Sequence, residues 1–375
     1  MKDHIIDVAS NIRVCVIGIG FQGGQSVACM RQNHSFQGLP FKYVAIDTHS
    51  SSFSPSAFDE LLLIEMPLAK EDVIAPLVLI DYLTRQKLES WRTELDCIFI
   101  ISALEDDAIT ALTAETVSLL KKTDQAMVIN IVTEPESESA QLTFQKCISQ
   151  IKSICDCVIT SSASQIHRQL AEEPQMNNTP WYWPYQYQAA CNITYGIIGS
   201  QFSHGVIGVD FADIKNILQS GRDIKTVYVS AVGEDRVEQV AEKALFILRQ
   251  EGWRLTDPEI VAFMSNAITT HNDEFSLGEF DQIAATLLEE QPLDRNCKVT
   301  MSFNQAMMED EIDLFVLAVK AGKHKNKYMW IGGNVGLHTM KKESSQSLMR
   351  NYLFMSNEDF IKNFKKKYET IHIKN

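Results

Sequence analysis

Two hydrophobic patterns alternate along the first half of the chain. Short continuous runs of apolar, largely β-branched residues are separated by longer stretches with helical spacing of apolar positions. Continuous apolar runs are typical of strands buried on both faces, so this alternation predicts an α/β fold with a parallel sheet covered by helices. The expected strands are 12–17, 41–47, 61–65, 96–102, 126–133 and 156–160, with helices from about 27 and near 71–90, 106–122 and 138–154.

The pattern changes near residue 205. A short amphipathic run at 205–218 precedes a mixture of helices and strands, which predicts a smaller α+β domain that packs through the helix starting at Asp210. Its expected elements are strands at 226–232 and 260–270, helices at 234–250 and 276–290, and two final strands, 298–304 and 313–320, joined by a polar turn. The expected organisation is a Rossmann-like nucleotide-binding domain at 1–204, a loop and central helix at 205–220, the α+β domain at 221–322, and a tail at 323–375.

Composition fits this picture of a large globular chain. With 375 residues, of which 45% are hydrophobic and 22% charged, the chain can bury the cores of two domains. No apolar run is long enough to cross a bilayer and the first ten residues lack the apolar core of a signal peptide, so we expect a cytoplasmic protein. The eight cysteines contain no CxxC pair. Cys155 and Cys157 could form half of a metal site, but buried free thiols are the preferred interpretation, and we predict no metal centre.

Charge is distributed unevenly. The net charge of −14 argues against nucleic-acid binding. The tail at 323–375, however, has 11 Lys and Arg against four Asp and Glu. A basic segment of this kind is either a solvated tail, the simpler interpretation, or an arm that contacts an acidic partner or a membrane surface.

Candidate chemistry begins at the first strand, which runs into a glycine-rich stretch ahead of a helix. Gly18, Gly20 and Gly23 satisfy the pattern GxGxxG, and Gly24 and Gln25 follow. Glycines at a helix N-terminus let a phosphate approach backbone N–H groups. Asp47, at the end of the second strand, has the spacing of a ribose-binding carboxylate. These residues alone leave three readings open: an NAD-dependent oxidoreductase, another nucleotide-binding protein, or a structural turn.

A pair of carboxylates, Asp210 and Asp213, stands at the head of the amphipathic run. Asp210 can cap the following helix, with Asp213 in its first turn, because the leading N–H groups of a helix lack partners and favour negative charge. Capping is the simpler interpretation. The surrounding sequence suggests an additional role.

The order of these parts resembles FtsZ, the bacterial division member of the tubulin superfamily. The similarity extends over roughly 11–322 and disfavours the oxidoreductase. The segments that carry it are RVCVIGIGFQGGQSVACM, FKYVAIDTHS, AMVINIVTEP, GVIGVDFADIKNIL, TVYVSAVGEDRVEQVAEKAL, EFSLGEFDQIAATL and MMEDEIDLFVLAVKAG. The resemblance implies a GTP- or GDP-binding fold, with Mg²⁺ accompanying the nucleotide, and head-to-tail association with itself or with another FtsZ/tubulin-like subunit.

The phosphate side of the implied site departs from the family. There, the loop after the strand at 96–102 reads GGGTGTG and its N–H groups wrap the β- and γ-phosphates, whereas an ungapped comparison places DDAITAL, residues 106–112, at this point. Two like unit charges ~4 Å apart repel by about 4 kcal/mol at an effective dielectric of ~20. Asp106 and Asp107 either cap the next helix, which we favour, or hold a bridging cation. In both cases the resemblance implies weakened or lost GTP binding.

On the base-binding side of the implied site, some residue types of the family are retained and others are replaced. Gln25 has a carboxamide where the family has Asn, and Tyr187 falls where an aromatic ring stacks on guanine. Cys191 and Ala163 replace polar residues of the family. Because Tyr187 belongs to the aromatic run at 181–187, core or interface packing is the simpler interpretation.

The opposite face keeps its acids. By resemblance, Asp210 and Asp213 would orient the water that attacks the γ-phosphate held by a neighbouring subunit, although Gly208 replaces the family's Asn. The sequence therefore suggests a divergent cytoskeletal or assembly protein, a pseudo-GTPase able to join filaments. A genuine GTPase with a cation-bridged site, an NAD-linked oxidoreductase and a non-polymerising scaffold remain alternatives.

Overall fold

The computed structural model describes residues 12–321, apart from 34–35, 49–53, 65–79, 105–106, 123–124, 136–137, 163–184, 203–208, 270–276, 290–295 and 304–310. The tail at 323–375 lies outside the described residues, as do Asp106, Ala163 and Gly208.

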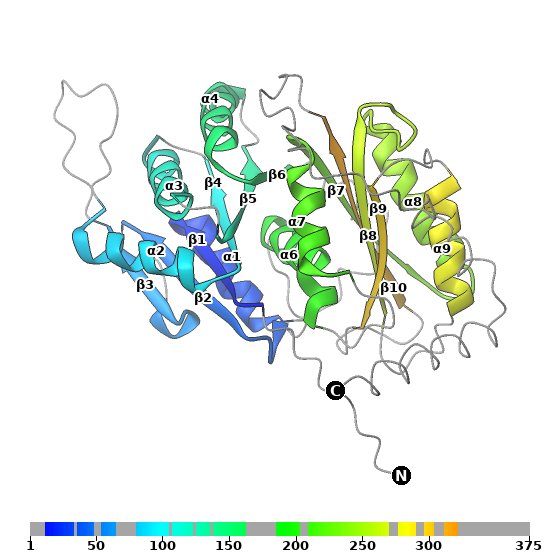
Figure 1. Ribbon diagram of the computed structural model, residues 1–375, viewed down its shortest axis with the longest axis horizontal. Helices are drawn as coiled ribbons and strands as arrows, with labels where there is room; N and C mark the ends of the chain where they lie inside the picture. Colours follow the sequence, from blue (N-terminus) through cyan, green and yellow to red (C-terminus); the bar gives the residue numbers. More distant parts are fainter. Residues whose placement is uncertain are drawn as a thin grey trace, which may run out of the picture.

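A six-stranded sheet forms the first half of the molecule (Figure 1). Its strands follow the order β3-β2-β1-β4-β5-β6, and every neighbouring pair is parallel. This is the parallel α/β sheet that the apolar runs predicted. The strands are β1 (Val14–Ile19), β2 (Phe41–Asp47), β3 (Glu60–Leu63), β4 (Cys97–Ala103), β5 (Met127–Glu134) and β6 (Cys157–Ser162).

Helices cover both faces of this sheet, because its strands are apolar on both faces. On one face pack α1 (Gly20–Gln32) and α6 (Tyr185–Phe202). On the other face lie α2 (Tyr82–Glu94), α3 (Asp107–Leu120) and α4 (Glu138–Ile154). A single-turn 3-10 helix, η3 (Pro55–Ala57), precedes β3.

Two helix positions differ from the sequence prediction. The helix expected near 71–90 is α2, which begins at Tyr82 because the Asp81 side chain accepts hydrogen bonds from the backbone N–H groups of Leu83 (2.9 Å) and Thr84 (3.0 Å). The part at 71–79 lies outside the described residues. The helix expected from about 27 begins already at Gly20, so Gly20, Gly23 and Gly24 lie in its first turns rather than in a separate loop, and Gly18 lies in β1.

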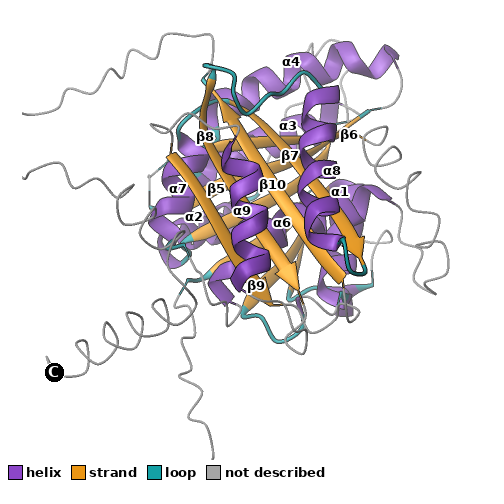
Figure 2. Cartoon of the chain, turned by 90° about the vertical axis from the view of Figure 1, so that its right-hand side faces the viewer, coloured by secondary structure: helices purple, strands orange, loops and turns teal. Residues whose placement is uncertain are grey.

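The second half is built on a four-stranded sheet in the order β7-β10-β8-β9. It comprises β7 (Asp223–Val232), β8 (Ile260–Thr269), β9 (Asn296–Phe303) and β10 (Glu311–Lys320), with β10 antiparallel to both of its neighbours and β8 parallel to β9. Helices α8 (Arg236–Gln250) and α9 (Leu277–Glu289) cover its outer face (Figure 2). The polar turn expected between the last two strands does not make them a hairpin, because β8 lies between β9 and β10.

Helix α6 lies between the two sheets (Figure 1). One hydrophobic core runs from the strands and α1 of the first half, through α6, to β8 and β10. Helix and sheet approach closely at Gly196, where an added Cβ would lie 2.2 Å from the Phe315 ring. The short helix α7 (Phe211–Gln219), expected to be the junction, packs against β8 beside α6. No helix among the described residues is long and apolar enough to span a membrane.

Candidate functional site

The glycines where β1 passes into α1, here called the glycine turn, are closely packed: Gly18, Gly20 and Gly23. A Cβ on Gly18 would lie 2.3 Å from the carbonyl oxygen of Gly23, and one on Gly23 would lie 2.2 Å from the carbonyl oxygen of Ile101 in β4. Gly20 has φ +70°, a left-handed conformation that favours glycine. The three glycines of the GxGxxG pattern therefore let α1 start directly against β1 and β4.

Ile109, in the first turn of α3, occupies the space in front of this turn. A Cβ on Gly20 would lie 2.6 Å from Cδ1 of Ile109, and the Ile109 side chain packs onto the core between the sheet and α2–α3. Ile109 belongs to the 106–112 stretch, where the resemblance places the phosphate-wrapping glycines. An apolar side chain thus faces Gly20 where a phosphate site needs N–H donors.

The residues of the predicted base side are mostly buried. Gly24 is buried and Gln25 partly exposed on α1, and Tyr187 is 8% exposed in α6. Cys191, one turn after Tyr187, is buried close to Cys29 of α1, and burial raises the pKa of the Cys29 thiol to about 12. Asp47 is also buried, and its carboxylate accepts a hydrogen bond from the backbone N–H of Thr48 (2.6 Å). Cys191 thus belongs to the hydrophobic core that α6 shares with α1, and Tyr187 is buried in α6.

The two acids of α7 have contacts within the chain. Asp210 is the N-cap of α7 and accepts a hydrogen bond from the backbone N–H of Asp213 (2.7 Å), so the capping prediction is confirmed. The Asp213 carboxylate pairs with Nζ of Lys298 in β9 at 2.9 Å. Asp210 is exposed and Asp213 partly exposed, so the solvent-facing acids also have structural partners.

Solved structures supply the comparison that decides the fold, since no family model and no curated protein matches the chain. A mutant FtsZ from M. jannaschii aligns with TM-score 0.66 and 16% identity, over 83% of this chain and 91% of that one. CetZ2 from Haloferax volcanii, in a GTPγS-bound protofilament, gives 0.55 and 14%, over 84% and 95%. TubZ from Bacillus thuringiensis serovar israelensis, in a GTPγS-form protofilament, gives 0.58 and 14%, over 84% and 90%. The chain has an FtsZ/tubulin-superfamily fold.

Within this FtsZ/tubulin fold, the sequence-predicted site residues form two separate groups. The glycines contact β4 and approach α3, on the first sheet, whereas Asp213 contacts β9 of the second sheet. The expected action of the acids on a neighbouring subunit stays a prediction.

Two residues in contact with these groups, Ile109 and Lys298, were not predicted from the sequence. The substitution of the family's glycines was visible, but nothing in the sequence indicated that Ile109 would face Gly20. Lys298 likewise carried no local signal, because its pairing with Asp213 depends on how β9 packs beside α7.

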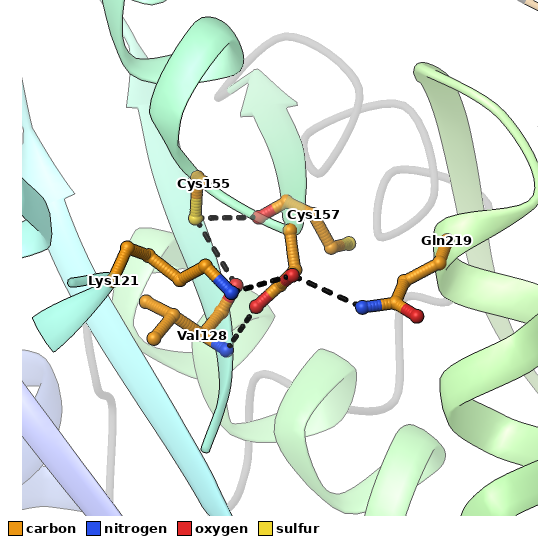
Figure 3. A network of polar contacts seen from close by, with 6 residues as sticks. Lys121, Val128, Cys155, Cys157 and Gln219 are labelled. Carbon is orange, nitrogen blue, oxygen red and sulfur yellow. Dashed lines mark hydrogen bonds and ion pairs between the residues drawn. The ribbon is translucent and has the colours of Figure 1, made fainter. Parts of the chain in front are cut away.

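The cysteines, and the metal-ligating side chains in the described part of the chain, add no further candidate. All eight cysteines are free; six are buried, among them Cys157, and Cys155 is partly exposed. The thiol of Cys155 lies 3.1 Å from the carbonyl oxygen of Val128 and 3.2 Å from that of Cys157 (Figure 3), and burial raises the pKa of the Cys155 thiol to about 12. Among the described residues, no three His, Cys, Asp or Glu side chains gather to hold a metal ion.

Proposed function

We propose that this chain is a divergent FtsZ/tubulin-like assembly protein that associates head to tail, with itself or with a related subunit, and has lost tight GTP binding. Its assembling unit would comprise the domain at 1–204, the segment at 205–220 and the domain at 221–322. The fold supports a cytoskeletal type of protein, and two of the matched structures are protofilaments.

The position of Ile109 carries the proposal. If a nucleotide phosphate were to lie against Gly20, the Ile109 side chain would have to move, and its apolar surface would replace hydrogen-bond donors. Leaving phosphate oxygens without donors in a partly buried site is costly, because such charges need paired or hydrogen-bonding neighbours. The glycines that remain are explained by packing and by the positive φ of Gly20, so they do not argue for a nucleotide.

The acids at the start of α7, Asp210 and Asp213, support the proposal that this end of the helix belongs to an assembly face. The exposed Asp210 and the partly exposed Asp213 would meet a partner subunit, and the Lys298 ion pair would neutralise Asp213 in the free chain. A role for these acids in catalysis on a partner's nucleotide would require Asp213 to exchange Lys298 for the partner. This exchange of partners by Asp213 would take place in a complex with a nucleotide-bound subunit.

Nucleotide binding and sedimentation test the proposal together. We expect titration with a fluorescent GTP analogue and Mg²⁺ to show no saturation at micromolar concentrations, and GTP to leave the sedimentation profile unchanged. Self-association that depends on protein concentration would support the assembly role. Micromolar GTP binding with a hydrolysis rate that rises with protein concentration would overturn the loss of GTP binding, and a monomer at all concentrations that pairs with no related subunit would overturn assembly.

A variant separates the proposal from the alternative of a cation-bridged GTPase. Replacing both aspartates of the 106–112 stretch, in Asp106→Gly/Asp107→Gly, removes negative charge from the stretch where the resemblance places the phosphate-wrapping glycines. The proposal predicts a partial gain of GTP affinity, because repulsion falls and backbone freedom rises while Ile109 still faces Gly20. A bridging cation would lose its ligands, so the GTPase alternative predicts a loss of affinity.

A further inference from the structure

One carboxylate joins elements from both halves of the molecule. Asp156 lies in the turn between α4 and β6. Its Oδ1 accepts hydrogen bonds from Nζ of Lys121 (2.9 Å) and Nε2 of Gln219 (3.0 Å), and its Oδ2 accepts one from the backbone N–H of Val128 (2.8 Å). Figure 3 labels the three donor residues, Lys121, Gln219 and Val128. The side chains of Lys121 and Asp156 are only 12% and 10% exposed. Lys121 follows the last residue of α3, and Gln219 is the last residue of α7.

The two helices that meet at Asp156 begin at the two candidate groups of residues. Helix α3 runs from its first turn, which contains Ile109 opposite Gly20, to Leu120, next to Lys121; its 14 residues span about 21 Å at 1.5 Å per residue. Helix α7 runs from the Asp210 cap to Gln219. Asp156 therefore stands at the far end of both helices from the candidate groups.

The hydrogen-bonding pattern makes these two contacts interdependent. Lys121 and Gln219 share the same oxygen, and Lys121 is the cation that Asp156 pairs with in this largely buried position. Removing the cation from a buried ion pair is destabilising, because it leaves the carboxylate as an uncompensated buried charge. A displacement of the end of α3 would therefore take the cation away from the carboxylate that also accepts a hydrogen bond from Gln219, at the end of α7.

We propose that Asp156 is a coupling hub that transmits structural change between α3 and α7, and so between the glycine turn and the acidic start of α7. The proposal goes beyond the proposed function and does not depend on it, because the coupling would exist whether or not nucleotide binds or the chain assembles. Coupling of this kind is reciprocal: a change at α7 must affect α3 as much as the reverse.

Amide hydrogen exchange tests the coupling directly, since it reports local opening element by element. In Lys121→Met, which keeps the aliphatic stem and removes the cation, we expect the amides of Ile217 and Leu218 in α7 to exchange about tenfold faster. Amides of α9, which belongs to another core cluster, should keep their rates. The reciprocal variant Gln219→Met alters an exposed side chain and should speed exchange in the last turn of α3.

Lys122→Met is the matched control. Lys122 adjoins Lys121 but pairs with Glu89 of α2 at 2.6 Å, so its loss should leave α7 unchanged. Wild-type exchange rates of α7 in Lys121→Met, or equal acceleration by Lys122→Met, would overturn the proposal. If Lys121→Met accelerates every element equally, the Gln219→Met arm decides: faster exchange confined to the end of α3 supports the hub, and unchanged exchange there overturns it.

Discussion

At the scale of single residues, the glycines of the turn after β1 show that a nucleotide-type motif can be explained by packing. The Cβ positions of Gly18 and Gly23 are filled by backbone atoms, and Gly20 needs a positive φ. These demands come from the close start of α1 against the sheet and exist without any ligand. The motif is therefore informative about the fold and insufficient for nucleotide binding.

Gly23→Ala tests this packing role. Alanine is favoured over glycine within a helix by about 1 kcal/mol. The added Cβ would nevertheless lie 2.2 Å from the carbonyl oxygen of Ile101, which belongs to a central strand and cannot rotate away. Overpacking of this kind typically costs about 1–3 kcal/mol, so we expect a net loss in the free energy of unfolding, measured by urea denaturation.

Gly38→Ala is the control for Gly23→Ala. Gly38 has φ +81° and nothing within 4 Å of an added Cβ, so only the left-handed backbone is penalised, by about 1–2 kcal/mol. Unchanged or increased stability of Gly23→Ala would contradict the packing role.

The candidate site was only partly predictable at this scale. The glycine turn and the Asp210 cap are local features, and local sequence patterns identified both. Two other contacts, Ile109 with Gly20 and Asp213 with Lys298, join residues that are far apart in the chain. Such contacts depend on how the elements pack, so a single sequence does not predict them.

At the scale of elements, the strands were predictable because both of their faces are buried and their apolar runs are continuous. The same burial is the reason why the hydrophobic pattern did not predict α6. All residues from Ile193 to Gly199 are buried, so α6 has no polar stripe to reveal helical spacing. Its length became clear only from the structure, where α6 contacts both α1 and the strands of the second sheet.

Gly196 sets how closely α6 approaches the second sheet. In Gly196→Ala the new Cβ would lie 2.2 Å from the Phe315 ring, and we expect a loss of about 1–3 kcal/mol in unfolding free energy. Phe315→Leu in the same chain should recover part of that loss, because it removes the ring that clashes. Thermal or urea unfolding of the two single variants and the double variant measures the coupling. Strictly additive losses would show that this contact does not limit the approach.

Glu60 links β3 to β2 and α2, and gives stability a pH dependence. Burial raises the pKa of Glu60, but the hydrogen bonds and charges of Lys42 and Lys87 lower it by more, so the pKa lies below the ordinary value of 4.5. Nζ of Lys42 lies 2.8 Å from Oε1 of Glu60. A lowered pKa in the folded state means that this stabilisation is present above the unfolded pKa and is lost as pH falls through the folded pKa.

The variant Glu60→Gln should therefore be less stable than wild type at pH 7, and the difference should shrink as the pH falls below about 4.5. Urea midpoints between pH 7 and pH 3 measure this. Glu242→Gln, which removes an exposed charge from α8, is the control. A difference that stays constant over this range would show that the Glu60 carboxylate contributes through its shape rather than its charge.

At the scale of the whole molecule, the shared core bears on how the two halves unfold. Residues of the first sheet, α1, α6, β8 and β10 form one hydrophobic cluster, so neither half can open at α6 without exposing apolar surface of the other. We expect a single cooperative transition, although multidomain chains often unfold in steps.

Two variants that each retain one tryptophan would test this expectation. Trp91 is buried at 2% exposure between α2 and the first sheet, and Trp253 lies beside the second, with Nζ of Lys320 4.3 Å from its ring centroid. Urea unfolding followed by either tryptophan should give superimposable transitions, with the other tryptophans replaced by Phe. Gly196→Ala should shift both transitions together, since it disturbs the junction that they share. A transition of Trp253 at lower urea than that of Trp91 would show that the second sheet opens independently, and that the core through α6 does not make the two halves one cooperative unit.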